Sequence, residues 1–133
     1  MERSSGAVIY KDKKFLLLKY SNGHWGFVKG HIEGNESEKE AMFRETLEET
    51  GLKKEDLKLI ENYKEKISYY FKKNNNTIYK EVIFFLAKSN TFNVKLSHEH
   101  QDYEWLEYNK AFDKLTFENS KNLLKKANKI LKK

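Results

Sequence analysis

The sequence contains no cysteine among its 133 residues. Disulfides, thiolate metal sites and a cysteine nucleophile are therefore excluded, and redox chemistry finds no support. The chain also lacks proline, internal repeats and linker-like segments, so its length predicts one domain over residues 1–133. No apolar run approaches the ~20 residues that cross a bilayer, and Met1–Ser5 is polar with no signal-peptide core behind it. We therefore expect a cytoplasmic protein without a membrane partner.

The residues that are present indicate a folded, basic domain. Hydrophobic residues make up 38% of the chain and charged residues 35%, and it has 2 Trp, 8 Tyr and 9 Phe, which is typical of a globular protein. The formal net charge is +6, and many lysines lie in residues 110–133. Apolar residues recur among them at helical spacing, namely Leu123, Leu124, Ala127, Ile130 and Leu131. Because no stacking aromatics accompany these lysines, we interpret them as the solvated face of a terminal helix. We expect a monomer with no specific nucleic-acid partner.

Alternating apolar residues predict a series of strands with two tight turns. The segment GAVIYKDKKFLLLKY contains two strands around the polar turn KDKK, and KKNNN separates the two strands of a long hairpin. The predicted strands lie in residues 6–20, near 25–28, in 57–71 and 77–89, and near 103–107. Helical spacing after the last strand predicts helix to the end of the chain. With one internal helix, these strands predict an α+β fold with helices packed on a sheet.

The internal helix is predicted over residues 38–50. Ser37 and Glu40 match a capping box at its start, and Gly51 stands where a C-terminal cap belongs. This segment is acidic although the whole protein is basic. Only Lys39 and Arg44 balance its glutamates, which are Glu36, Glu38, Glu40, Glu45, Glu48 and Glu49.

Three of these glutamates crowd together at the end of the helix. Glu45, Glu48 and Glu49 are spaced i, i+3 and i+4, which brings their carboxylates to one side. They also lie at the negative end of the helix dipole. Each unfavourable effect is only a few tenths to about 1 kcal/mol, so a solvated acidic face is one interpretation. The other is a hard divalent cation such as Mg²⁺, which carboxylates and substrate phosphates hold.

The segment from residue 30 to residue 52 favours the metal site. Gly30, Glu36 and the run RETLEETGL (44–52) closely resemble the signature of the Nudix hydrolases. Every fixed glycine, glutamate and arginine of that signature has a counterpart here, and Thr46 departs from it at a position that is usually aliphatic. The competing EF-hand calcium pattern, D-x-[DN]-x-[DN]-G, is missing.

The resemblance implies a hydrolase of nucleoside diphosphates linked to another moiety. It implies an α/β/α sandwich with a mixed sheet, an internal catalytic helix and a C-terminal helix. Mg²⁺ or Mn²⁺ would help to break a phosphoanhydride. Glu48 and Glu49 would be metal ligands, the Gly30 carbonyl a further ligand, and Glu45 a ligand or the base that activates water. Arg44 would orient a neighbouring glutamate.

Two flanking stretches resemble the asymmetrical diadenosine tetraphosphate hydrolases of this family. They are HWGFVKGHIE (24–33) and LSHEHQDYEWL (96–106), and the similarity runs in order over most of the chain. This resemblance implies cleavage of a dinucleoside polyphosphate to ATP and AMP. Lys29 and His31 would face the phosphate chain, and Glu99 would be an additional metal ligand or an alternative base. From the residues alone, the alternative interpretations are that His31 is a loop histidine with a structural hydrogen bond and that HEH is a solvated loop or a transition-metal site.

Adenine binding needs a flat apolar surface, because stacking contributes ~1–3 kcal/mol per base. Phe84 falls where the resembling family has a stacking tyrosine, and Tyr79 or Tyr103 would form the other wall. Aromatic residues in strands are otherwise core residues. In the resembling family a proline usually precedes the lysine that corresponds to Lys29, and here Val28 stands in its place. The segment HIEGNE also lacks the proline that usually precedes its glycine. Both differences leave the loop that would bind the phosphates less constrained.

Two other functions agree with parts of the sequence. A Nudix pyrophosphohydrolase acting on a nucleoside triphosphate or a triphosphorylated RNA 5′ end would share the metal site, and a substrate panel separates it from the first function. A non-catalytic nucleotide or RNA binder on the same fold is the second. The intact set of Glu45, Glu48 and Glu49 argues against it, since a binder has no need of it.

Overall fold

A computed structural model describes residues 1–132. Lys133, the last residue of the predicted domain and basic tail, lies outside the described residues. In chain order the elements are β1 (Glu2–Lys11), β2 (Lys14–Tyr20), β3 (Trp25–Gly26), β4 (Val28–His31), α1 (Glu38–Thr50), the 3-10 turn η1 (Lys54–Asp56), β5 (Leu57–Lys73), β6 (Asn76–Ser89), β7 (His100–Glu107), α2 (Tyr108–Lys114) and α3 (Glu118–Leu131). Within residues 1–132, no helix is both long and apolar enough to span a membrane.

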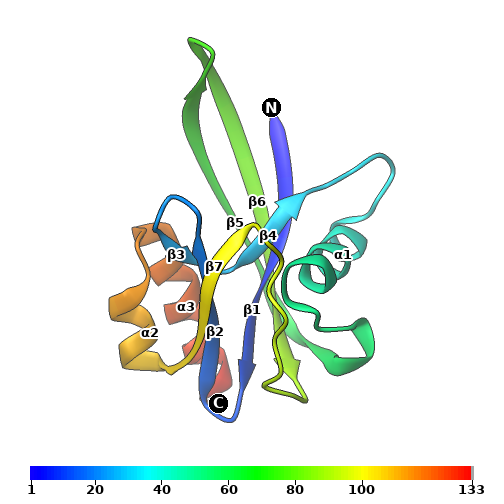
Figure 1. Cartoon of the computed structure of the whole chain (residues 1–133), viewed down its shortest axis with the longest axis vertical. Coiled ribbons are helices and arrows are strands. Elements are labelled where there is room, and N and C mark those ends of the chain that lie inside the picture. The colour runs from blue at the N-terminus through cyan, green and yellow to red at the C-terminus, as the bar shows by residue number, and fades with distance from the viewer. Residues whose placement is uncertain (133) are drawn as a thin grey trace.

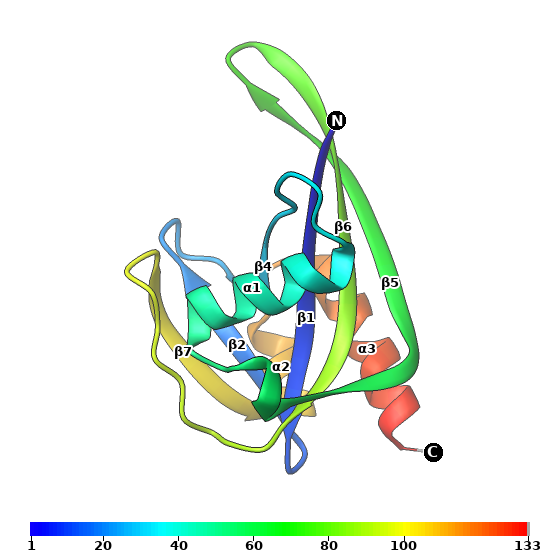
Figure 2. The same cartoon turned by 90° about the vertical axis from the view of Figure 1, so that its right-hand side faces the viewer.

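The strands form one mixed sheet between two layers of helix (Figures 1 and 2). The main strand order is β3-β2-β1-β6-β5, with β4 added to β1 and β7 added to β2. The β1–β6 pair is parallel, and the other pairs are antiparallel. One apolar core lies between the sheet and α2 and α3, and a second lies under α1. This arrangement confirms the predicted α+β class and the α/β/α sandwich.

Both predicted turns, KDKK and KKNNN, contain two-residue hairpin loops. Asp12 and Lys13 join β1 to β2, and both have positive φ, at 50° and 68°. Asn74 and Asn75 join β5 to β6 with φ of 53° and 67°. Positive φ at both central residues matches the right-handed twist of the flanking strands. The long hairpin is therefore confirmed, and it projects beyond the body of the protein (Figure 1).

The predicted capping of the internal helix is confirmed at both ends. The Ser37 hydroxyl accepts a hydrogen bond from the Glu40 amide at 3.1 Å, and the Glu40 carboxylate accepts one from the Ser37 amide at 2.8 Å. At the other end, Gly51 has φ of 76° and its amide donates to the Leu47 carbonyl at 2.9 Å. Because L-residues with a side chain rarely adopt this left-handed conformation, glycine ends the helix where the sequence predicts.

The predicted strand near residues 25–28 is two strands with different partners. The paired residues of β1 and β2 are those beside their turn, 10–11 and 14–15, and the two strands diverge beyond it. β3 pairs with β2, whereas β4 pairs with residues 4–7 of β1. The chain therefore crosses the wedge between two diverging strands, and β4 brings the signature glycine into the sheet beside α1.

The last strand also begins earlier than predicted. β7 starts at His100, whereas the sequence predicted a start near residue 103. The additional residues extend the pairing with β2 as far as Tyr20, through an irregular register next to Lys19. His100, the last residue of the predicted HEH loop, therefore belongs to the sheet. The helix predicted after this strand is two helices, α2 and α3, that are separated by residues 115–117.

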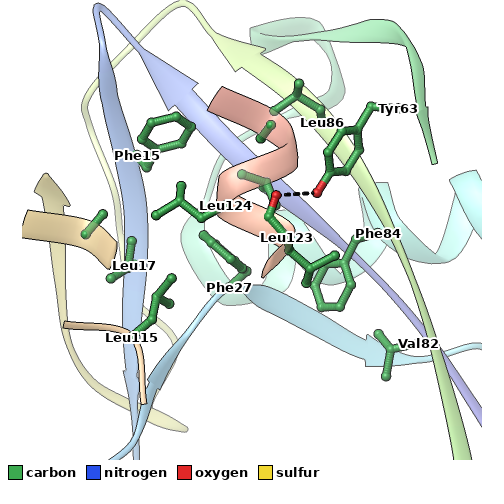
Figure 3. Packing of buried hydrophobic residues seen from close by; sticks show 13 residues of the cluster. Phe15, Leu17, Phe27, Tyr63, Val82, Phe84, Leu86, Leu115, Leu123 and Leu124 are labelled. Carbon is green, nitrogen blue, oxygen red and sulfur yellow. Dashed lines mark hydrogen bonds between the residues drawn. The ribbon is translucent and has the colours of Figure 1, made fainter. Parts of the chain in front are cut away.

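A wide bulge in β5 connects the sheet to the terminal helix. Between two paired positions, β5 advances five residues (59 to 64) while β6 advances two (87 to 85). Asn62 in the bulge has φ of 69°. The next residue, Tyr63, is 3% exposed, and its hydroxyl donates to the Leu123 carbonyl of α3 at 2.8 Å (Figure 3). The bulge thus directs the Tyr63 hydroxyl from an edge strand into the core, where the Leu123 carbonyl accepts its hydrogen bond.

We expect Tyr63→Phe to lower the free energy of unfolding by about 1 kcal/mol, because it removes one buried hydrogen bond. Tyr70→Phe is the matched control in the same strand, since Tyr70 is 71% exposed and its change should stay within about 0.5 kcal/mol. Urea unfolding of the three proteins measures both values. Equal stability of Tyr63→Phe and Tyr70→Phe would show that the bond to α3 contributes nothing.

Candidate active site

The end of α1 is held by the loop that precedes β7. The Ser97 amide donates to the carbonyl of Glu49 at 3.1 Å, and the Lys95 amide donates to the carbonyl of Thr50 at 2.8 Å. The last carbonyls of a helix have no partner within the helix. The loop residues 90–99 therefore satisfy them and fix the acidic end of α1 against the sheet.

Arg44 connects the acidic residues of α1 to the loop before it. Its guanidinium donates two hydrogen bonds to Glu36, at 2.6 and 2.9 Å, and one to Glu45 at 2.9 Å. It also lies 3.3 Å from the Glu48 carboxylate and donates to the His31 carbonyl at 2.8 Å. Hydrogen bonds to charged groups contribute about 1.5–3 kcal/mol, whereas like-charge repulsion on a helix costs a few tenths. Attraction to Arg44 therefore outweighs the repulsion that the spacing predicts.

Gly30 and Glu45 are in direct contact. A Cβ atom added to Gly30 would lie 1.9 Å from the carboxyl carbon of Glu45, so any other residue at this position of β4 would displace the Glu45 carboxylate. Burial raises the pKa of Glu45, and hydrogen bonds from Arg44 oppose that rise. The signature glycine thus allows the carboxylate of α1 to approach the backbone of β4.

Glu49 is the most enclosed acid of the cluster, at 5% exposed. Its carboxylate lies 2.5 Å from Nδ1 of His100 and accepts a hydrogen bond from the Ser97 hydroxyl at 3.0 Å. Burial raises the pKa of Glu49 to about 7, the Ser97 hydroxyl opposes the rise, and the nearby carboxylates of Glu99 and Glu45 add to it. Glu99 is exposed, yet it is close enough to act on both glutamates of the helix.

This cluster has the donor chemistry of a site for a hard divalent cation. In residues 1–132, no three acidic or histidine side chains converge as a ligand set; Glu45 is hydrogen-bonded to Arg44, and Glu49 contacts His100. The available donors are nevertheless carboxylate and carbonyl oxygens, which Mg²⁺ and Mn²⁺ prefer. Because Gly30 has no Cβ, the Glu45 carboxylate reaches the backbone of β4 there. The residues therefore fit the ion.

An aromatic pocket of about 410 Å³ lies on the other face of the sheet. It is lined by residues of β2 to β6 and of the start of α3, namely Tyr20, His24, Gly26, Phe27, Lys29, Ile67, Tyr69, Phe84, Phe117, Glu118, Asn119 and Ser120. The Lys29 ammonium lies 3.4 Å from the Tyr69 hydroxyl and 5.9 Å from the centre of that ring. Burial lowers the pKa of Lys29. The pocket therefore combines flat apolar walls with one enclosed cation.

Tyr20 forms a wall between this pocket and the carboxylates. Its ring stacks on His24 and meets His100 edge-on, with ring centres 4.6 Å apart in both pairs, and its hydroxyl donates to the Phe27 carbonyl at 2.5 Å. Burial, followed by the charges of Glu49 and Glu45, raises the pKa of Tyr20. Tyr20 lines the pocket and contacts His100, which in turn contacts Glu49, so the two sites adjoin.

The structure brings together most of the predicted site residues. Gly30, Arg44, Glu45, Glu48 and Glu49 lie around one end of α1, with Glu99 beside them. The predicted substrate residues Lys29 and Phe84 line the pocket, where Phe84 is 3% exposed. His31 contributes its carbonyl to Arg44, but its side chain is largely exposed and lies 3.5 Å from Glu2.

Two predicted base-binding residues lie elsewhere. Tyr79 packs against Tyr70 on the projecting hairpin, with ring centres 5.1 Å apart, and Tyr103 packs under α1. Neither lines the pocket that contains Phe84. Tyr79 and Phe84 are five positions apart on β6, and side chains at odd spacing point to opposite faces of a strand. That spacing would have excluded Tyr79 as a partner of Phe84.

Other members of the site were not predicted from the sequence. The pocket residues Tyr20, His24, Tyr69 and Phe117 and the Glu49 partner His100 were assigned no role. Two of them lie in the stretches that carry the family resemblance: His24 is the first residue of HWGFVKGHIE, and His100 lies within LSHEHQDYEWL. The others come from separate strands and a helix start, and no local pattern marks them.

Comparison with known proteins agrees with this geometry. A model of the NUDIX domain matches residues 2–127. The asymmetrical bis(5′-nucleosyl)-tetraphosphatase of Mus musculus is 36% identical over 122 residues, which cover 89% of this chain and 80% of the relative. The protein of that name from Caenorhabditis elegans is 36% identical over 136 residues, which cover 97% and 96%. A crystal structure of a C. elegans Ap4A hydrolase binary complex has a TM-score of 0.88 at 34% identity, covering 99% of this chain and 98% of that one.

The chain therefore belongs to the Nudix family, and it is a Nudix hydrolase. Within that family it is similar over most of its length to asymmetrical hydrolases of diadenosine tetraphosphate, abbreviated Ap4A.

We expect Gly30→Ala to lower the rate of nucleotide hydrolysis by about 100-fold, because the added Cβ displaces the Glu45 carboxylate by an ångström or more. Gly34→Ala is the control: its Cβ meets nothing within 4 Å, although φ of 51° costs about 1–2 kcal/mol of stability. Initial rates and thermal unfolding of both variants separate the two effects. A Gly30→Ala protein with the wild-type rate would show that the contact has no part in the reaction.

Proposed function

We propose that this protein hydrolyses Ap4A asymmetrically to ATP and AMP with Mg²⁺ or Mn²⁺. One observation carries the proposal: an aromatic pocket that contains a lysine adjoins a cluster of carboxylates, because Tyr20 of the pocket wall contacts His100 and His100 contacts Glu49. A nucleoside fits the pocket, and the metal-bound phosphates that follow it fit the cluster. The similarity to proteins named for this activity supports the choice of substrate.

The residues that would hold the metal are Gly30, through its carbonyl, and Glu45, Glu48, Glu49 and Glu99. When bound, the ion neutralises phosphate charge and lowers the pKa of a bound water. Arg44 keeps Glu45 and Glu48 in position through the hydrogen bonds described above. Glu45 and Glu99 are the two candidates for the general base, since both belong to the cluster and neither takes part in the short contact between Glu49 and His100.

The adenine ring would stack in the aromatic pocket. Phe84 supplies one surface, as the sequence predicted, while Tyr69 and Phe117 take the place of Tyr79 and Tyr103 as the further walls. Lys29 lies in the pocket and would bind the first phosphates as a point charge. His31 would reach the phosphate chain by leaving Glu2, because its exposed side chain is free to turn.

We expect Glu48→Gln and Glu49→Gln each to reduce Ap4A turnover by at least about 100-fold without unfolding the protein. Each change removes a metal ligand, and removing a negative charge at the end of a helix also relieves repulsion. Glu55→Gln, at an exposed position of η1, is the matched control and should keep the wild-type rate. Circular dichroism reports the fold. Normal turnover in both helix variants, or turnover that persists in excess chelator, contradicts the metal assignment.

The site of water attack is tested by hydrolysis in ¹⁸O-water. If one adenosine occupies the pocket and the phosphates extend past Lys29, water attacks a terminal, nucleoside-bearing phosphorus. Label should then appear in AMP and be absent from ATP, because the incoming oxygen stays on the phosphorus that it attacks. Mass spectrometry of the products reads the label. Two molecules of ADP would mean symmetrical cleavage, and labelled ATP would mean attack on the phosphorus that remains in ATP.

The same assay on nucleoside triphosphates and triphosphorylated RNA tests the other Nudix substrates.

A further inference from the structure

His100 contacts the proposed metal cluster without being one of its ligands. It is the first residue of β7, and only 3% of its side chain is exposed. Its Nδ1 lies 2.5 Å from Oε2 of Glu49 and 3.3 Å from the hydroxyl of Ser97. The Ser97 hydroxyl also reaches Glu49, so two side chains converge on the same carboxylate oxygen.

The surroundings of His100 assign the position of its proton. Nε2 is buried and has no hydrogen-bond partner among residues 1–132. A proton on Nε2 would therefore be a buried donor without an acceptor, which is costly. Nδ1 faces a carboxylate, which is a strong acceptor. The neutral ring with its proton on Nδ1 is the form that satisfies this site.

The ring itself is fixed by packing. Tyr20 meets His100 edge-on with ring centres 4.6 Å apart, and the hydroxyl of Tyr20 is anchored on the carbonyl of Phe27. The backbone of β7 at His100 is paired with Tyr20 of β2. Neither the backbone nor the side chain of His100 is therefore free to follow Glu49 if that carboxylate moves.

We propose that His100 is a positioning residue, which donates a hydrogen bond from Nδ1 to orient the Glu49 carboxylate toward the divalent ion. The inference rests on the proposed role of Glu49 as a ligand. Groups that hydrogen-bond to metal ligands fix their orientation, and losing one typically costs 10–100-fold in metal affinity. Because Glu49 is the most enclosed acid of the cluster, it depends on such partners more than the exposed Glu48 and Glu99.

The test compares two amides at this position in the full-length protein. His100→Asn carries an amide nitrogen where the histidine has Nδ1, whereas His100→Gln carries it where the histidine has Nε2. Titration calorimetry with Mn²⁺ alone, without nucleotide, measures the affinity of each variant. We expect His100→Asn to stay within about 3-fold of the wild type and His100→Gln to weaken Mn²⁺ binding about 10- to 100-fold. His98→Asn, an exposed histidine of the same segment, is the matched control and should bind as the wild type does.

Two further measurements separate positioning from a purely structural role. In a Glu49→Gln background, His100→Gln should cause little additional loss of Mn²⁺ affinity, because the residue acts through Glu49. In the wild type, ¹H–¹⁵N correlation through the imidazole should show the proton on Nδ1, a measurement that requires no variant to fold.

Unchanged Mn²⁺ affinity in His100→Gln overturns the inference, even if its thermal stability falls. A proton found on Nε2 also overturns it, and so does a wild type that does not bind Mn²⁺. A wild type that binds Mn²⁺ but leaves Ap4A intact contradicts the proposed function instead, while the variants still decide the role of His100.

Discussion

The hydrogen bonds of Arg44 are the interaction on which the rest of the site depends. The helix α1 carries acids at its negative end, where repulsion opposes them by a few tenths of a kcal/mol and the helix dipole by up to about 1 kcal/mol. One guanidinium joins Glu36 of the preceding loop to Glu45 and Glu48 of the helix and to the carbonyl of His31 at the end of β4. A lysine has no planar fork and could not satisfy partners in so many directions. Arg44 thus stabilises an acidic face that charge repulsion and the helix dipole oppose.

A second constraint comes from the sheet. β1 and β2 diverge beyond their turn, and the short strands β3 and β4 occupy the wedge between them. This places Lys29 toward the pocket and Gly30 against Glu45, since neighbouring residues of a strand face opposite sides. The strand β4 thus supplies residues both to the aromatic pocket and to the carboxylate cluster. Tyr20, at the end of β2, separates these two parts of the site and contacts each of them.

Local features were predicted correctly because residues close together in the sequence determine them. The capping box of Ser37 and Glu40, the cap at Gly51 and the two hairpin turns depend on a few neighbouring residues, and all were confirmed. The predicted strand near 25–28 was wrong as one unit, because its two halves pair with different strands. The bulge at Asn62 was not predicted either, since its register is set by partners in β6 and by α3.

The sequence by itself determined the acidic helix, its caps and the spacing of its glutamates, and the resemblance of residues 30–52 indicated the family. These features are short-range, so a single segment of chain specifies them. Only the tertiary structure decided which aromatic residues share a pocket: Phe84 faces α3, whereas Tyr103 packs under α1. It also decided that His100 meets Glu49, 51 positions (100 minus 49) earlier in the chain. A pattern along one strand shows that side chains alternate between two faces, but which residues of other elements cover each face depends on how the whole chain packs.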